Sequence, residues 1–404
     1  MKILVYHPTG NENVRALLRA LKKSDMLHSF HTTIAVFESS WYYRFLRGKL
    51  SRFKRRTCDS NIKKQTKLYP FLELLMFAGV KRFKGKEITS GYINLTLSGK
   101  VARGMTNVAN QVDGVYCYPH GAKQIFEVAK QHKKICFYEQ TTAYYKEFEQ
   151  IVSKEKELNP DWMNTITMYK SLDRVLFDQL TEELNLCDVI VAPSTYVKNT
   201  LLKFGFQDSK IKVIPYGFPD VSEKKYPKGK SNKLNLLFVG NISQLKGISY
   251  LFEAIGQLHE KVNLTLVGNI SNSKNPFLIE NLNKYNYKGT MSHNQVMKEM
   301  RRHDILIFPT LSDGYGLVIN EAMSQGTPVI TTPCSGGPDV IIDKVNGWII
   351  PAASVEPMVD LLNELYANPH LLQEVSSNAF KTAQSRPWAV YEKEVTSFIK
   401  KSMN

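Results

Sequence analysis

Cysteines are scarce in this sequence, and their spacing excludes the two structures that they most often build. The chain has five in 404 residues, and no two of them are separated by two residues. An odd number at such spacing fits neither a disulfide framework nor a zinc site. Most of the five lie in apolar runs, where a reduced thiol behaves as a small hydrophobic side chain. We therefore expect a reducing compartment, the cytoplasm.

Long apolar runs are also absent. A membrane-spanning helix needs about 20 apolar residues, but the best candidate, residues 71–80, is short and contains Glu73. The N-terminal apolar run, residues 3–6, ends at His7 and Pro8, which makes it too short for a signal peptide. The sequence therefore predicts neither a transmembrane helix nor a signal peptide.

The usual metal-binding patterns are missing as well. No two aspartates are separated by a single residue, and histidines and cysteines do not cluster at the spacing of metal ligands. We expect no metal site and no cofactor, so any chemistry that the chain performs should be metal-independent.

Apolar residues, in contrast, are numerous enough for two cores. They make up 43% of the 404 positions, and one domain usually holds about 100–200 residues. Two series of alternating strands and helices are separated by a polar segment, rich in Pro, Lys and Ser, at 219–233. The apolar runs do not alternate strictly, which is typical of parallel strands covered on both faces. We predict an α/β fold of two Rossmann-like, doubly wound domains that face a cleft, residues 1–216 and 217–386.

Positive charge is concentrated in one segment. The net charge of the chain is +16, and residues 41–86 contain 14 lysines and arginines against Asp59 and Glu73. Such a segment, with aromatic and aliphatic side chains mixed in, suits an anionic membrane surface. The alternatives are a solvated basic face whose aromatic residues belong to the core and, less favoured, a nucleic-acid site. The aromatic and aliphatic residues in question include Trp41, Tyr42, Tyr43, Phe45, Leu46, Phe53, Phe71, Leu74, Leu75, Phe77 and Phe83.

The strongest constellation for chemistry is residues 313–323, which follow an apolar strand and open a helix. Gly314 and Gly316 let the backbone approach a ligand, and the helix N-terminus, with a partial charge of roughly +0.5, suits a diphosphate. Glu321, just over one turn into the helix, can accept hydrogen bonds from neighbouring hydroxyls such as those of a ribose. Asp313 precedes the glycines, where a sugar would project. The alternative is an ordinary glycine-rich turn with an acidic N-cap.

A second element lies in the loop after the strand predicted at 234–239. Gly240 permits close approach of a ligand, and Lys246, near the start of the next helix, can neutralise a phosphate. A surface lysine in an ordinary loop is the alternative. Because the same half of the chain contains the acidic, glycine-bearing element, we favour phosphate binding.

These motifs resemble those of the retaining glycosyltransferases of family 4, the group 1 transferases with the GT-B fold. The resemblance covers residues 234–351, and the spacing from Asp313 to Glu321 matches the family's pair of acids. The first acid is aspartate here rather than glutamate, and no arginine closely precedes Lys246, so phosphate would be neutralised by Lys246 and the helix dipole. Further matching residues are Val239-Gly240, Gly268, Lys288-Gly289, Gly326 through Ile330, Ser335-Gly336-Gly337 and Asn346-Gly347.

The resemblance implies a role for each matching residue. Glu321 would hold the ribose, Lys246 the diphosphate, and Asp313 the sugar near its reacting carbon. The backbone of Gly316 and Leu317 would bind phosphate. The last helix, in residues 387–404, would pack back on the first domain. Tyr287 and Lys288 would meet the base, and Gly240, Asn241, Gly268, Gly314 and Tyr315 complete the expected donor-binding set.

Residues on the acceptor side must come largely from the first half of the chain. His7, His120 and Glu139 stand at the C-terminal ends of predicted strands, which face the cleft in a doubly wound sheet. Gly10 is expected to shape the first turn. We place His120 among the catalytic residues with Lys246, Asp313 and Glu321. For each of the two histidines, a loop or core residue with satisfied hydrogen bonds is the alternative.

Together these features predict a metal-independent glycosyltransferase of the hexosyltransferase type, retaining by resemblance. Its donor would be a UDP-, GDP- or ADP-sugar, and its acceptor a glycan or lipid-linked glycan, as in bacterial polysaccharide or lipopolysaccharide assembly. We expect it in the cytoplasm, peripheral on the inner membrane face through residues 41–86, with no nucleic-acid partner. The alternatives are a sugar-nucleotide epimerase on the same fold and a non-enzymatic, basic membrane-surface binding protein.

Overall fold

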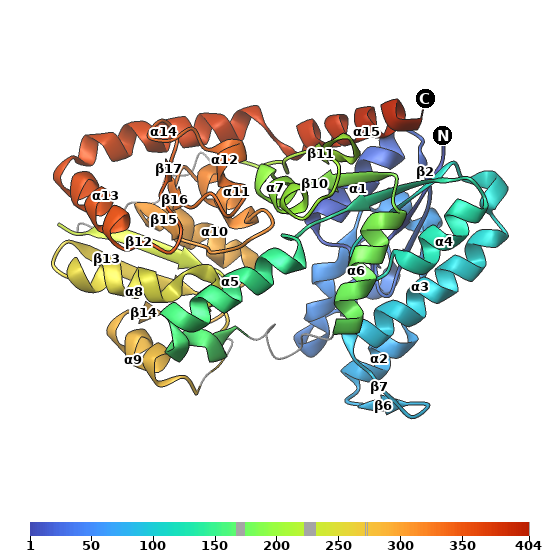
Figure 1. The fold of residues 1–404 in the computed structure, drawn as a ribbon, viewed down its shortest axis with the longest axis horizontal. Helices are drawn as coiled ribbons and strands as arrows, with labels where there is room; N and C mark the ends of the chain where they lie inside the picture. The colour runs from blue at the N-terminus through green and yellow to red at the C-terminus, as the bar shows by residue number, and fades with distance from the viewer. Residues whose placement is uncertain (167–173, 222–231, 271, 273, 404) are drawn as a thin grey trace.

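The computed structural model describes residues 1–166, 174–221, 232–270, 272 and 274–403. It contains two parallel sheets, one from each half of the chain, with helices packed around them (Figure 1). The α/β architecture predicted from the sequence is confirmed. Most of the expected linker at 219–233 lies outside the described residues, so the domain boundary stays a prediction.

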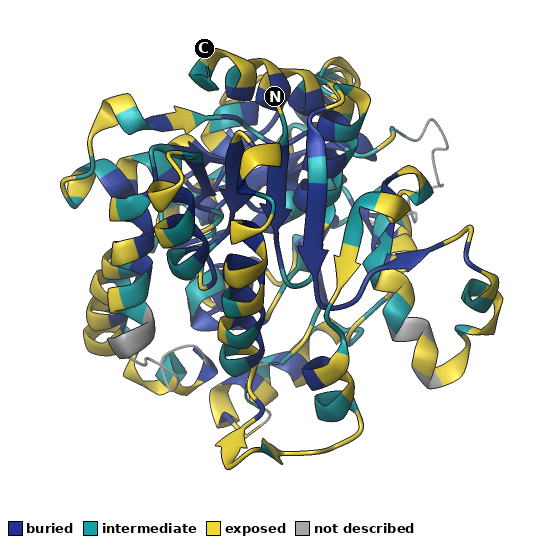
Figure 2. Ribbon diagram, turned by 90° about the vertical axis from the view of Figure 1, so that its right-hand side faces the viewer, coloured by how far each residue is buried: buried dark blue, intermediate teal, exposed yellow. Residues whose placement is uncertain are grey.

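The first sheet has seven strands in the order β11-β10-β9-β8-β1-β2-β5. Neighbouring strands are parallel throughout, so their carboxyl ends lie along one edge. The central strands are buried (Figure 2, dark blue), as their continuous apolar runs require. The strands are β1 (Ile3–Tyr6), β2 (Leu27–Thr32), β5 (Thr66–Leu68), β8 (Gly114–Cys117), β9 (Ile135–Glu139), β10 (Val189–Ala192) and β11 (Ile211–Val213).

Helices cover both faces of this sheet and form two separate cores with it. The last helix of the chain belongs here, because Tyr391, Val395 and Ile399 are buried in the same core as α1, and Arg19 of α1 forms an ion pair of 2.9 Å with Glu392. The chain therefore returns to the first domain at its end (Figure 1). The helices are α1 (Glu12–Lys23), α3 (Ser90–Thr106), α4 (Lys123–Gln131), α6 (Arg174–Leu186), α7 (Thr195–Lys203) and α15 (Trp388–Met403).

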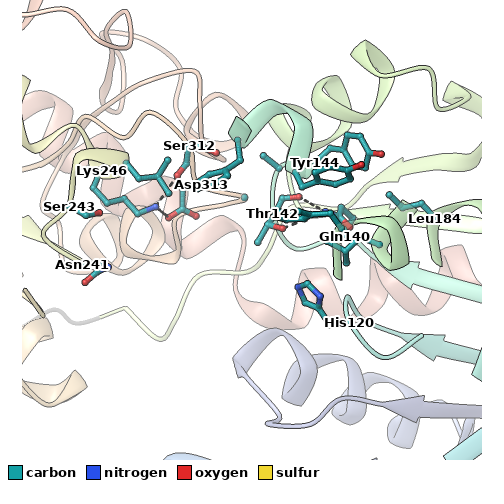
Figure 3. Close-up of a pocket in the computed structure, with 17 residues that line it drawn as sticks. His120, Gln140, Thr142, Tyr144, Leu184, Asn241, Ser243, Lys246, Ser312 and Asp313 are labelled. Atoms are coloured by element: carbon teal, nitrogen blue, oxygen red, sulfur yellow. Dashed lines mark hydrogen bonds and ion pairs between the residues drawn. The ribbon is translucent and has the colours of Figure 1, made fainter. Parts of the chain in front are cut away.

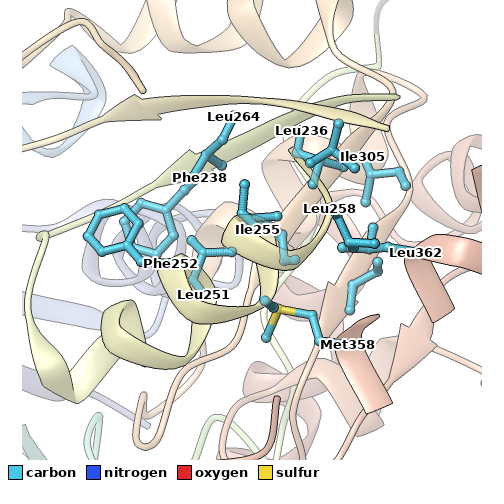
Figure 4. Packing of buried hydrophobic residues seen from close by; sticks show 14 of the residues in the cluster. Leu236, Phe238, Leu251, Phe252, Ile255, Leu258, Leu264, Ile305, Met358 and Leu362 are labelled. Carbon is cyan, nitrogen blue, oxygen red and sulfur yellow. The ribbon is translucent and has the colours of Figure 1, made fainter. Parts of the chain in front are cut away.

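The second sheet has six parallel strands in the order β14-β13-β12-β15-β16-β17. Leu236 and Ile305 of this sheet pack against α8 and α13 (Figure 4), and each such buried side chain contributes about 1.5–3 kcal/mol to folding. The strands are β12 (Leu234–Val239), β13 (Val262–Val267), β14 (Asn286–Tyr287), β15 (Ile305–Phe308), β16 (Val329–Thr331) and β17 (Trp348–Ile349). The helices are α8 (Ile248–Gln257), α9 (Pro276–Lys284), α10 (His293–Arg302), α11 (Leu317–Ser324), α12 (Gly337–Val340), α13 (Glu356–Ala367) and α14 (Pro369–Ser385).

One piece of the first half of the chain packs against the second domain. Helix α5 (Tyr145–Leu158) and the short 3-10 helix η5 (Pro160–Thr165) lie beside α8 and α9 (Figure 1). Gln244 donates from its side chain to Glu155 at 2.7 Å and from its backbone to Thr165 at 2.9 Å, and Trp162 packs on the second core. The domain bounds stay a prediction, and the later part of this piece, from Glu155 to Thr165, contacts the second domain. The sequence shows the apolar face of α5 but not which domain covers it.

The basic residues 41–86 fold as short elements at the edge of the first domain. Strand β5 extends the first sheet, and buried Ile62 and Leu72 attach the segment to the domain. Figure 1 draws α2 and the β6–β7 hairpin at the lower tip of the domain. The elements are η1 (Trp41–Phe45), η2 (Gly48–Arg56), β4 (Thr57–Cys58), which pairs with β3 (Val36–Phe37), η3 (Ser60–Gln65), α2 (Phe71–Phe77), β6 (Arg82–Phe83) and β7 (Lys86–Glu87).

Candidate functional site

Two adjacent cavities lie between the domains, where loops leave the carboxyl ends of both sheets. Their volumes are about 440 Å³ and about 370 Å³. Asn241, Lys246 and Asp313 line both, so these three residues stand where the cavities meet. Ligands of open α/β sheets bind at such an edge.

Lys246 and Asp313 form an ion pair inside the cleft. The ammonium lies 2.6 Å from a carboxylate oxygen of Asp313 and donates to the Ser312 carbonyl at 3.0 Å (Figure 3). Burial acts to raise the pKa of Asp313, but the charge and hydrogen bond of Lys246 and the backbone N–H groups of Tyr315 and Gly316 outweigh it and hold this pKa below its usual value. The pair is therefore ionised, and a positive charge is fixed in the cleft before any ligand arrives.

Gly247 allows the loop that carries Lys246 to lie close to Pro309, the residue that follows β15. The 3-10 helix η8 (Gln244–Lys246) ends at this glycine, which has a φ of +71°. A Cβ at Gly247 would lie 2.0 Å from the Pro309 carbonyl oxygen, so a larger residue would push the Lys246 loop away from Asp313.

The turn at residues 313–316 has the shape that its glycines predict. Gly316 is left-handed, with a φ of +79°, and precedes α11, while the Asp313 carboxylate accepts from the Tyr315 N–H at 3.1 Å. Gly314 allows contact between the domains, because a Cβ there would lie 1.9 Å from the Thr141 carbonyl oxygen. Gly316, Leu317 and Tyr315 line the smaller cavity.

The side chain of Tyr315, however, forms its hydrogen bonds in the protein interior. It is buried, and its hydroxyl donates to the Tyr216 carbonyl at 3.1 Å and accepts from Asn320 at 3.0 Å. Of the expected donor-binding residues, this one can therefore offer a ligand its backbone rather than its hydroxyl.

Glu321 lies on α11 and lines neither of the two cavities. Its side chain is 23% exposed, and its carboxylate lies 3.6 Å from His293 at the start of α10. Partial burial raises the pKa of Glu321 to about 7. The carboxyl group has therefore not turned into the core, and it changes charge near neutral pH.

The remaining expected donor residues divide into two groups. Gly240 and Asn241 line the smaller cavity. Gly268, Tyr287 and Lys288 line neither: a Cβ at Gly268 would lie 1.7 Å from the Gly240 carbonyl oxygen, Tyr287 donates to the Gly268 carbonyl at 3.0 Å, and Lys288 pairs with Glu299 at 2.7 Å. Their contact with a base stays a prediction, while the structure gives them contacts within the protein.

His120 stands in the larger cavity on a loop that a buried carboxylate holds. Its backbone is left-handed, with a φ of +69°, and its exposed side chain faces the cleft (Figure 3). Glu183 of α6 is fully buried and accepts from the backbone N–H of His120 at 3.0 Å and of Ala122 at 2.9 Å, and from the Tyr138 hydroxyl at 3.0 Å. This role of Glu183 could not be predicted from the sequence, because Glu183 is one of several acidic residues on a helix.

His7 lies in the smaller cavity, in the first turn after β1. Its Nδ1 accepts from the backbone N–H of Thr9 at 3.0 Å and of Gly10 at 2.9 Å, which places the proton on Nε2. Burial, aided by the charge of Arg56, lowers the pKa of His7 to about 3, so the imidazole is neutral. Gly10 has a φ of +65°, as a turn-shaping glycine should.

The expected position of Glu139 needs correction. We expected it at the cleft, but it is fully buried and lines neither cavity. Its carboxylate accepts from Tyr116 and Tyr216, both at 2.6 Å, and from Asn13 at 2.9 Å. Glu139 is the last residue of β9, and its side chain turns into the core, where three donors satisfy it. The next residue, Gln140, lines the larger cavity instead.

Sequence reasoning also missed the apolar wall of the larger cavity. The periodicity of α5 and α6 indicates that each has an apolar face, but not that parts of both faces meet across the cleft. Among the described residues this wall consists of Ala143, Tyr144, Tyr145, Phe148, Phe177, Leu180 and Leu184.

Two further observations concern metals and membranes. Among the residues that the structure describes, no group of three or more His, Cys, Asp or Glu side chains is placed to hold a metal ion. In the same residues, no helix has the length and apolar composition that crossing a bilayer requires.

Comparison with known proteins places the second domain in a family. A family model described as glycosyl transferases group 1 matches residues 220–382, which include β12, the Lys246 loop, the 313–316 turn and α11. We call residues 220–382, which match this family, the group 1 domain. The resemblance predicted from the sequence is thus confirmed at the level of group 1, and the narrower assignment to family 4 stays a prediction.

Curated relatives match through about half of their length. An uncharacterized glycosyltransferase of Methanocaldococcus jannaschii is 27% identical over 205 residues, which cover 50% of this chain and 56% of the relative. The capsular polysaccharide biosynthesis glycosyltransferase CapM of Staphylococcus aureus is 25% identical over 194 residues, with 45% and 50% covered. The group 1 domain is therefore related to glycosyltransferases, while the chain spans about half the length of these relatives.

Solved structures extend the likeness of fold to the whole chain. The crystal structure of Anabaena HepE in complex with UDP-glucose superposes with a TM-score of 0.63, covering 99% of this chain and 100% of HepE at 16% identity. At that identity the likeness concerns the fold alone. The group 1 domain and the domain before it thus form the GT-B fold that the sequence predicted.

Proposed function

We propose that this protein is a metal-independent glycosyltransferase that moves a sugar from a nucleoside diphosphate to a glycan or lipid-linked acceptor, with retention at the anomeric carbon. The observation that carries the proposal is the Lys246–Asp313 ion pair at the junction of the two cavities, next to the backbone of Gly316 and Leu317. A fixed ammonium and a helix N-terminus provide the charge that a departing diphosphate needs.

The division of the cleft suggests where each substrate lies. The smaller cavity, lined by Gly240, Gly316 and Leu317, would hold the diphosphate, and Glu321 would accept from the ribose hydroxyls. The larger cavity, lined by His120 of the first domain and Asp313 of the second, would hold the sugar and the acceptor.

The proposed reaction uses the two substrates and the protein groups that line the cleft. The acceptor hydroxyl oxygen bonds to the anomeric carbon on the face from which the diphosphate leaves, and the departing phosphate oxygen takes the hydroxyl proton. The products are the glycoside and the nucleoside diphosphate. Lys246 stabilises the negative charge that develops on the leaving group. A β-linked product from an α-linked donor would contradict retention.

Donor binding tests the assignment without knowledge of the acceptor. We expect one of the UDP-, GDP- or ADP-sugars to raise the thermal unfolding temperature, since a ligand that binds the folded state stabilises it. Glu321→Ala should abolish this shift, while the exposed control Glu280→Ala should retain it. A full shift in the Glu321 variant would reject the ribose assignment. Consumption of donor in the absence of any acceptor would favour an epimerase.

Donor affinity should depend on pH through Glu321. The carboxyl group has a pKa of about 7 in the free protein, and hydrogen bonds from ribose would lower this pKa in the complex. Binding then releases a proton, so affinity should rise as pH is raised towards 7 and level off above it. Calorimetric titration of wild type and His293→Gln should give the same slope, because Glu321 rather than His293 carries the effect. An affinity that falls over this range would contradict the assignment.

Glu183 should act on turnover through His120. Glu183→Gln replaces a carboxylate oxygen with an amide donor facing the His120 loop, and a displacement of about 1 Å can cost on the order of 100-fold in rate. We expect kcat to fall by about tenfold or more, with no further loss when the change is added to His120→Ala. Glu182→Gln, an exposed neighbour, is the control. Equal losses in both backgrounds would show that Glu183 acts independently of His120.

A further inference from the structure

Exposed apolar side chains gather in the 41–86 segment to an unusual degree. Trp41 is 80% exposed, Phe45 68% and Phe71 55%. Single exposed apolar residues are ordinary, but a concentration of them marks an interaction site. Half of the large apolar side chains that are exposed in the described residues belong to this segment, the other members being Leu50, Leu68, Leu74 and Val80.

Exposed basic side chains lie in the same segment. In the described part of the chain, none of the exposed lysines and arginines of this segment is in an ion pair with a carboxylate. Lys246 and Lys284 elsewhere in the chain do form such pairs. Some lie over aromatic rings: Lys54 is 5.2 Å from the Tyr43 ring centre and Lys84 is 5.8 Å from that of Phe83. The exposed basic residues are Arg44, Arg47, Lys54, Arg55, Lys63, Lys64, Lys67, Lys81, Arg82, Lys84 and Lys86.

Part of the segment is packed against the first domain, which fixes the folded elements that carry its exposed side chains. Arg56 and the buried Glu73 form an ion pair, and Ile62 and Leu72 are buried. The alternative that the aromatic residues belong to the core holds in part, because Phe53 and Phe77 are half-buried and contact each other. It fails for Trp41, Phe45 and Phe71.

We propose that this outer surface docks on an anionic lipid bilayer, with its apolar side chains in the headgroup region and its basic side chains against lipid phosphates. Lipid fits better than nucleic acid because Leu50, Leu68, Leu74 and Val80 offer a nucleic acid nothing to stack on, whereas a bilayer interface accepts aliphatic and aromatic groups alike. Each basic residue near such a surface adds to the attraction.

The docking surface is joined to the cleft by hydrogen bonds. Arg56 donates to the Pro8 carbonyl at 3.3 Å, and Arg15 donates to the carbonyls of Gly10 at 3.0 Å and of Arg55 at 3.2 Å. The turn that carries His7 into the smaller cavity is thus attached to the segment that would lie on the membrane. Membrane docking would deepen the proposed function and rests on it, because a lipid-linked acceptor would meet the cleft at the bilayer surface.

Cosedimentation of the full chain with vesicles tests the proposal. We expect binding to phosphatidylcholine vesicles that contain about one third phosphatidylglycerol, weaker binding to pure phosphatidylcholine, and loss of binding as salt rises, because surface charges are screened. The assay contains no sugar nucleotide, so its outcome is separate from that of the donor-binding test. Equal binding to both vesicle types, or binding to neither, would overturn the proposal.

Paired variants identify the surface. Trp41→Ser with Phe71→Ser, and separately Lys81→Gln with Lys84→Gln and Lys86→Gln, should each weaken vesicle binding about tenfold or more. The controls are Phe277→Ser with Ile342→Ser, and Lys381→Gln with Lys400→Gln and Lys401→Gln, which change residues that are exposed elsewhere on the protein and should bind as wild type. Losses as large in the controls would overturn the assignment, as would an RNA or DNA oligonucleotide that binds the 41–86 surface more tightly than the vesicles do.

Discussion

Lys246→Ala is expected to lower kcat for sugar transfer by about 100- to 1000-fold, which is the usual effect of removing one preorganised group that stabilises charge in a transition state. The ammonium lies 2.6 Å from the Asp313 carboxylate, in a part of the cleft where both cavities meet. A low-dielectric, partly buried position makes its charge more effective than that of a surface lysine. Steady-state kinetics at saturating donor measure the loss.

The matched control for this prediction is Lys284→Ala in the same domain. Lys284 also pairs with a carboxylate, that of Glu280 at 2.7 Å, but on the exposed face of α9. Its removal should leave kcat unchanged, since exposed pairs contribute little. Wild-type turnover in the Lys246 variant would remove the lysine from the reaction and with it the main support for the proposed site.

Glu139→Ala is expected to lower the free energy of unfolding by about 3–5 kcal/mol. The change leaves Tyr116, Tyr216 and Asn13 without their shared acceptor in the core, and each buried donor left unsatisfied costs about 1–3 kcal/mol. Urea unfolding monitored by circular dichroism gives the value.

Glu127→Ala provides the comparison, because this glutamate is exposed on α4 of the same domain. It should change the free energy of unfolding by less than about 0.5 kcal/mol. A Glu139 variant that keeps wild-type stability but shows a raised KM for the acceptor would restore the cleft role expected from the sequence.

The parts of the site that could be predicted are those in which backbone geometry and local chemistry coincide. Gly316 has a left-handed conformation and lies close to Phe308, and both features favour glycine at this position. Lys246 and Asp313 stand in loops after neighbouring parallel strands, β12 and β15, whose carboxyl ends must share one edge. Sequence order and strand direction together bring the two side chains near each other.

Other residues gave misleading or no signals because their surroundings come from distant parts of the chain. Glu139 ends a strand, as His120 nearly does, but a side chain at a strand end has two faces to choose from. The choice depends on Tyr116 and Tyr216, which meet Glu139 in the folded protein. Glu183 likewise acquires its role from a loop some sixty positions earlier in the chain.

By itself, then, the amino-acid order determined two parallel sheets, the position of the loops that carry Lys246 and Asp313, and the basic and apolar content of residues 41–86, because periodicity, glycine and charge act over short distances along the chain. Tertiary structure decided that α5 crosses to the second domain, that Glu139 is core rather than cleft, and that Trp41, Phe45 and Phe71 remain exposed. These outcomes depend on which surfaces cover one another, and burial is a property of contacts between segments far apart in sequence.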